Sequence, residues 1–256
     1  MNEQKYPQFE RLHILRTEAL CAVRNCAFET LPLYLSGYGA GIVSGCDFVT
    51  TKDLITLNAG LILHDNFLYR ITEPMSVHYE PTEEYILLKL IFEPARKTEL
   101  FLQRDIRIEL SADMNLAANE MELCRFKLKR GAILRTKYTD FIDRSTEFDT
   151  VNTINAPHSA IGGSTLSPDI LRAFASEAKN FSLDAEDFSF CLAALSGVLN
   201  AEQISFYVER RLKIELPDRD NQTLYDKLCL ILQDIKSGGR REIFSARRRR
   251  KEIMLD

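Results

Sequence analysis

Residues 150–169 have the sequence TVNTINAPHSAIGGSTLSPD, and the pattern of apolar residues changes across this stretch. Its Asn, Ser, Thr and Gly residues, together with Pro157, predict a linker or a long surface loop over 151–166. Ser167, Pro168 and Asp169 then form a typical helix start, with serine at the N-cap and proline at the first helical position. The stretch therefore predicts a boundary between a β-rich region and a helical one.

The residues before this boundary, 36–150, have the pattern of short strands. Tyr85–Phe92 is a continuous apolar run, typical of a strand that is buried on both faces. Apolar and polar residues alternate over 121–128, and a one-residue slip at Cys124-Arg125 predicts a β-bulge there. Turn residues recur about every eight to twelve positions, which predicts an antiparallel β-sandwich-like shell.

The residues after the boundary, 167–256, favour a helical bundle that ends in a basic tail. Apolar residues recur at three- and four-residue spacing after Ser167 and over 184–195, 201–212 and 222–236. In the second of these segments the expected inward-facing stripe is Phe188, Cys191, Leu192 and Leu195. Gly238 is the expected stop of the last helix.

The first 35 residues form a separate segment with helical spacing. Its periodic apolar residues are Phe9, Leu12, Leu15, Ala19, Val23 and Ala27. Pro32 is expected to end this helix at the latest. The chain is thus expected to have an α+β fold, with a helical segment over 1–35, a shell over 36–150, a linker over 151–166 and the bundle over 167–256.

Composition narrows the class of protein further. Of the 256 residues, 45% are hydrophobic and 27% are charged, which is ordinary for a globular protein. No apolar run reaches the roughly 18 residues that span a bilayer, and the polar start Met1-Asn2-Glu3 does not resemble a signal peptide. We therefore expect a cytoplasmic protein. The six cysteines form no CxxC pair, so neither a metal nor a cofactor is expected.

The charge of the chain is divided unevenly. The net charge is −4, but residues 238–256 hold seven basic and three acidic residues, so the preceding residues carry −8. The basic run in this tail consists of Arg247, Arg248, Arg249, Arg250 and Lys251. A solvated arm, or docking onto an acidic protein neighbour, is the favoured interpretation, because no aromatic residues interleave with the arginines. The alternative is binding to nucleic acid or anionic lipid.

Catalytic motifs give no positive signal, so the chain is predicted not to be an enzyme. HExxH, GxxxxGK[ST] and GxSxG are absent, and the glycines over 37–45 do not meet the GxGxxG spacing. His64-Asp65 is interpreted as a turn, and Asp140 and Asp143 as solvated acids. An enzyme with a site assembled from distant segments is the second alternative.

Several stretches resemble a pattern found in phage-tail and contractile-injection proteins. The G-x-V-x-G turn of this pattern is similar to residues 41–49 (GIVSGCDFV). Its V-x-P-G-x-A segment is similar to residues 54–63 (LITLNAGLIL), although Asn58 replaces the proline, and its short hairpin is similar to residues 66–70 (NFLYR). Residues 120–126 (EMELCRF) with 131–133 (GAI) are similar to the strand pair that closes such domains. Residues 223–228 (TLYDKL) resemble a helix of type VI secretion baseplate adaptors, in which strands also precede helices.

This resemblance implies a non-catalytic adaptor that docks onto other baseplate or tail subunits and forms a homotrimer. The helix residues implied to face the oligomer are Leu224, Leu228, Ile231 and Ile235. The basic run would dock onto a partner. The glycines expected to form turns of the shell are Gly37, Gly39, Gly41, Gly45 and Gly60.

Overall fold

Strand β7 (Tyr85–Phe92) lies at the centre of an antiparallel sheet in the computed structural model, which describes residues 6–11 and 14–238. Its neighbours are β10 (Ile106–Ser111) and β11 (Glu120–Lys127), and it is buried from Leu87 to Phe92, including Lys89. The β7–β11 register shifts between Glu122 and Cys124, which confirms the predicted bulge to within a residue. The continuous apolar run is thus the central strand that its pattern predicts.

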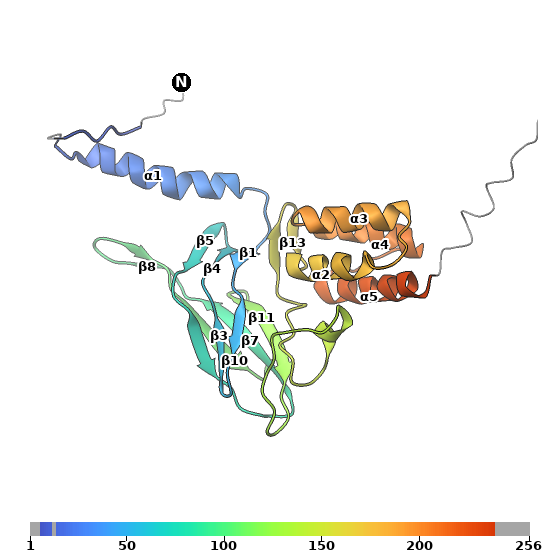
Figure 1. The fold of residues 1–256 in the computed structure, drawn as a ribbon. Coiled ribbons are helices and arrows are strands. Elements are labelled where there is room, and N and C mark those ends of the chain that lie inside the picture. The colour runs from blue at the N-terminus through green and yellow to red at the C-terminus, as the bar shows by residue number, and fades with distance from the viewer. Residues whose placement is uncertain (1–5, 12–13, 239–256) are drawn as a thin grey trace, which may run out of the picture.

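Two further sheets complete the strand region, and a short hairpin extends from it (Figure 1). One has the order β13-β12-β1-β4-β5, with strands Gly163–Thr165, His158–Ala160, Gly41–Gly45, Gly60–His64 and Phe67–Ile71. The other has the order β2-β3-β6, with strands Phe48–Thr50, Leu54–Leu57 and Met75–His78. The hairpin pairs β8 (Arg96–Lys97) with β9 (Leu102–Gln103). Side chains from the three sheets share one hydrophobic core, with Ile55, Leu57, Ile62, Leu88 and Leu123 fully buried in it.

The segment predicted as a linker contributes to a sheet. Strand β12 pairs in parallel with β1, with Ile42 opposite His158, and antiparallel with β13. Two polar residues of this segment hydrogen-bond to the backbone directly before β1. Ser159 Oγ donates to the carbonyl of Gly39 at 2.7 Å, and Ser164 Oγ donates to the carbonyl of Ala40 at 2.6 Å. The last strand of this sheet therefore ends directly before the first C-terminal helix.

Within the described residues four helices follow, and each begins where a polar side chain caps it. They are α2 (Pro168–Ala178), α3 (Ala185–Ser196), α4 (Ala201–Leu212) and α5 (Asn221–Ser237). The N-cap residues Ser167, Asp184, Asn200 and Asp220 each accept a hydrogen bond from a backbone N–H of the first turn. Gly238 ends α5 in the left-handed conformation, as predicted. The mixed α+β class is confirmed, with antiparallel sheets before helices, while the term bundle stays a prediction.

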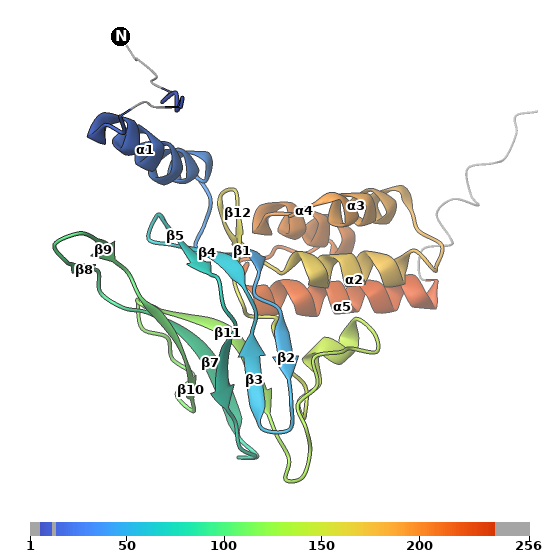
Figure 2. The ribbon, with the colours of Figure 1, turned by 60° about the vertical axis from the view of Figure 1, so that its left-hand side comes forward.

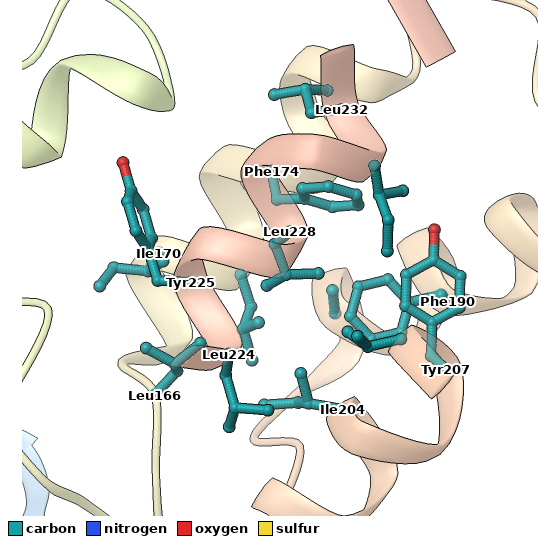
Figure 3. Close-up of a cluster of buried hydrophobic side chains, with 14 of the residues drawn as sticks. Leu166, Ile170, Phe174, Phe190, Ile204, Tyr207, Leu224, Tyr225, Leu228 and Leu232 are labelled. Atoms are coloured by element: carbon teal, nitrogen blue, oxygen red, sulfur yellow. The ribbon is translucent and has the colours of Figure 1, made fainter. Parts of the chain in front are cut away.

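The four helices bury a second hydrophobic cluster, shown in Figure 3. Phe174 of α2 meets the rings of Phe141 and Phe190 edge-on, with centroids 5.5 and 5.6 Å away. Phe190 also stacks on Tyr207 at 3.9 Å. The predicted stripe of α3 is wrong in part, because Cys191 is buried but Phe188, Leu192 and Leu195 are exposed. The inward side of α3 instead includes Asp187, which binds groups of α4.

Helix α1 (Thr17–Tyr34) lies apart from the rest of the chain (Figures 1 and 2). Its contacts with the body are few and involve mainly β5. The helix continues two residues beyond Pro32, so the expectation that this proline ends it is wrong. Pro32 has no N–H to donate to the carbonyl four residues earlier. Because α1 is exposed, water can hydrogen-bond to that carbonyl instead.

Candidate functional site

Helix α1 exposes more large apolar side chains than any of the helices that follow in the described residues. These exposed side chains are Leu20, Val23, Phe28, Leu31, Leu33 and Tyr34. At about 100° per residue these positions spread over more than half of the helix circumference. Its N-cap residue, Arg16, makes no side-chain capping bond. An isolated helix of this length is marginal in water, so α1 has the composition of a helix that another protein surface covers.

The turn between β8 and β9 carries a second exposed apolar group. Leu100, Phe101 and Leu102 are 80, 70 and 65% exposed, and the Thr98 hydroxyl holds the turn by accepting from the backbone N–H of Phe101 at 2.9 Å. In both views the hairpin projects on the same side of the strand region as α1 (Figures 1 and 2). Apolar groups at the tip of a projecting hairpin are typical of docking loops.

A buried ionic network fixes the relative positions of α3, α4 and α5. Arg211 Nε donates to Asp187 at 2.9 Å, and its Nη2 donates to Asp234 at 2.5 Å. The Tyr207 hydroxyl donates to the same Asp187 carboxylate at 2.8 Å, and burial beside this acid raises the pKa of Tyr207. Because each charged group has a partner, this network is structural and offers no free acid or base.

The residues named in the search for catalytic motifs have structural roles as well. Asp143 accepts two hydrogen bonds from the Arg135 guanidinium at 2.5 Å, and this contact lowers the pKa of the carboxyl well below its usual range. It is therefore paired, not solvated as predicted. His64 stacks on Phe92 with ring centroids 3.8 Å apart, and Asp65 and Asn66 have φ of 49° and 57°, as in a type I′ hairpin turn. The turn interpretation of His64-Asp65 agrees with this geometry.

The residues implied to face an oligomer lie inside the protein. Leu224, Leu228 and Ile231 are fully buried, and Ile235 is nearly so, in the cluster that α5 shares with the other C-terminal helices (Figure 3). Their own chain covers them, so they are not available to a second copy in this fold. The basic run 247–251 lies outside the described residues.

The predicted turn glycines lie along the start of the strand region. Gly37 precedes β1, Gly41 and Gly45 bound it, and Gly60 begins β4. Gly39 is required by close packing, because a Cβ there would lie 2.2 Å from the backbone carbon of Gly163. Gly60 similarly faces Cys46, whose Sγ would be 2.5 Å from an added Cβ. These glycines let the strands approach closely, which is a structural role.

Two classes of site are not found in the part of the chain that the structure describes. Residues 6–11 and 14–238 contain no cluster of three His, Cys, Asp or Glu side chains placed to hold a metal ion. Within the same residues, no helix combines the length and the apolar character needed to cross a membrane. The features that stand out are therefore the exposed apolar surfaces of α1 and of the β8–β9 turn.

Comparison with known proteins adds a distant structural likeness. No protein-family model matches the chain, and no curated protein matches it. Among solved structures, the chain is similar to the crystal structure of TssK, with 9% sequence identity and a TM-score of 0.42 over 91% of this chain and 72% of that one. At this level of similarity the function has to be argued from the residues of this chain.

Proposed function

We propose that this chain is a non-catalytic adaptor subunit of a phage-tail-like contractile assembly, of the type VI secretion baseplate kind, and that it self-associates through α1. The observation that carries the proposal is that α1 exposes more large apolar side chains than any of the helices α2 to α5 and lies outside both hydrophobic clusters. The resemblance of residues 41–70 and 120–133 to phage-tail patterns supports the kind of assembly. In this proposal 36–150 is a rigid shell, 151–166 joins it to the helices from residue 167 onward, and the β8–β9 turn meets another subunit.

The chemistry of α1 favours a second copy of itself as the partner. Its charged residues are only Glu18, Arg24 and Glu29, so its surface has no strong charge for an acidic or basic partner to recognise. A symmetric association of identical apolar helices covers every copy at once, as in most homo-oligomers. Three copies are the number that the resemblance implies. Arg247–Lys251 would then dock onto an acidic neighbour in the assembly.

The test is the solution mass of the full-length chain by light scattering. We expect a mass of at least twice 29.4 kDa, and near three times this value for the trimer that the resemblance implies. The variant Val23→Glu/Phe28→Glu/Leu31→Glu is expected to be a monomer, because three charges on α1 cannot be buried without partners. Circular dichroism should show unchanged strand content, since α1 lies outside both cores.

A matched variant separates α1 from exposed apolar residues in general. Leu192→Glu/Leu195→Glu changes the exposed side of α3 and should leave the mass of the oligomer unchanged. A wild-type chain that stays monomeric as its concentration rises contradicts self-association. An oligomer that survives the α1 variant but not the α3 variant moves the interface to α3.

A further inference from the structure

A hollow of about 470 Å³ lies where the strand region meets α2. Its apolar lining includes Ile42 of β1, Phe48 of β2, Leu123 of β11 and Val151. The face of α2 that carries Asp169, Arg172, Ala173 and Ser176 closes the opposite side. The hollow is therefore built from segments far apart in the sequence and is large enough for a small organic molecule.

One cation in this hollow forms no ion pair with the residues that the structure describes. Arg144, from the short 3₁₀ helix η1 (Ile142–Ser145), lines it. The Nε of Arg144 is buried and has no hydrogen-bond partner, and no residue within 6–11 and 14–238 forms an ion pair with this side chain. Its guanidinium carbon lies 4.3 Å from the centre of the Tyr138 ring, which holds the group in place. Asp169 attracts this charge but is already paired with Arg172. A buried N–H donor without a partner is costly, so the Nε of Arg144 suits an acceptor supplied by a ligand.

The other polar groups of the hollow limit the charge of that ligand. Arg172 is already paired with Asp169, and Asp47 adds a second acid to the lining. Burial lowers the pKa of His158 to about 4, so this ring is neutral near pH 7 and can donate one hydrogen bond. The Tyr138 hydroxyl is occupied, because it donates to the carbonyl of Val151 at 2.7 Å. A dianion such as phosphate would face two carboxylates, whereas a single carboxylate matches the one unpaired cation.

We propose that this hollow binds a small monocarboxylate with an apolar body, whose carboxylate pairs with the guanidinium of Arg144. The apolar part of the ligand would lie against Ile42, Phe48 and Val151, and the neutral ring of His158 would donate to the carboxylate. Arginine suits this role because its planar fork matches the two oxygens of a carboxylate. The site is independent of α1 and of any self-association.

The experiment is a calorimetric titration of the full-length chain with sodium benzoate. Benzamide serves as the neutral probe of the same shape, and inorganic phosphate as the dianionic probe, all at one ionic strength. Benzoate is expected to bind at least about tenfold more tightly than benzamide, because a charge-assisted pair exceeds a neutral hydrogen bond. Arg144→Met is expected to weaken benzoate binding about tenfold or more and to remove its advantage over benzamide.

Arg104→Met is the matched control. Arg104 also has a buried Nε without a partner and lies over an aromatic ring, Phe67, at 4.7 Å, but it does not line this hollow. Its replacement should leave benzoate binding unchanged. The proposal is overturned by equal binding of benzoate and benzamide to the wild-type chain, a comparison that does not depend on whether any variant folds. Tighter binding of phosphate than of benzoate, or no benzoate binding below about 10 mM, would overturn it as well.

Discussion

Helices α5 and α1 have nearly the same length, 17 and 18 residues, but opposite relations to solvent. Apart from Leu230, the large apolar residues of α5 lie on one side and are buried against α2 and α4, whereas those of α1 spread around the helix and are exposed. Apolar content alone therefore does not place a helix in a core. What decides its place is whether the apolar positions form one stripe that neighbouring elements of the same chain can cover.

The two helices also differ at their starts. Asp220 accepts from the backbone N–H of Thr223 at 3.0 Å and from its hydroxyl at 2.6 Å, so α5 begins with a capping residue. Helix α1 begins after Arg16, which provides no such bond. We conclude that the stability of α5 comes from its own chain, while α1 depends on what covers it. Three matched pairs of substitutions test this conclusion, each measured where the chain is monomeric.

The largest difference is expected between two leucines. Leu228→Ala in α5 removes a fully buried side chain and should lower the free energy of unfolding by about 3–4 kcal/mol, because it leaves a cavity. Leu31→Ala in α1 removes a side chain that is 47% exposed and should change this free energy by no more than about 0.5 kcal/mol. Urea denaturation followed by circular dichroism measures both. Equal losses would mean that α1 is packed into the body.

A smaller difference is expected between two tyrosines. The Tyr225 hydroxyl in α5 donates to the carbonyl of Phe141 at 2.6 Å, and burial raises the pKa of Tyr225, so it remains a donor. Tyr225→Phe should therefore cost about 1.5 kcal/mol, because it removes a buried hydrogen bond to that carbonyl. Tyr34→Phe in α1 changes a side chain that is 75% exposed and should have no measurable effect on unfolding. A cost of Tyr34→Phe equal to that of Tyr225→Phe would contradict the comparison.

The sequence predicts α5 and its neighbours well because their signals are local. Ser167-Pro168 and Gly238 mark helix ends that depend only on adjacent backbone groups. The orientation of α3 is different, because its inward side carries Asp187, whose burial depends on Arg211 in another helix. A prediction from hydropathy places the acid Asp187 on the surface and its apolar neighbour Phe188 on the inward side. In the structure Asp187 is buried and Phe188 is exposed. Strands β12 and β13 escape prediction for a similar reason, since β12 joins them to the sheet through β1, which lies more than a hundred residues earlier.

The candidate surfaces are predicted less well than the fold. The spacing of apolar residues predicts a helix in the first 35 residues, but two of the residues used, Phe9 and Leu15, precede α1. Spacing also does not show whether a partner covers the apolar residues of the helix. Arg144 carries no signal in its neighbours at all. Its proposed role depends on a buried Nε without a hydrogen-bond partner in a hollow assembled from distant segments, which is a property of the three-dimensional arrangement alone.

The smallest of the three differences is expected between the N-cap positions of the two helices. It tests whether α1 unfolds by itself or together with the rest of the chain. Asp220→Ala should lower the free energy of unfolding by about 1 kcal/mol, because two groups of Thr223 lose their acceptor at the start of a packed helix. Arg16→Asp should supply α1 with the missing cap and a favourable charge at its N-terminus. We expect this variant to raise the helix content of α1 in circular dichroism without moving the midpoint of global unfolding. An increase in global stability of about 1 kcal/mol would instead show that α1 unfolds together with the body, because a cap stabilises only the unit in which its helix unfolds.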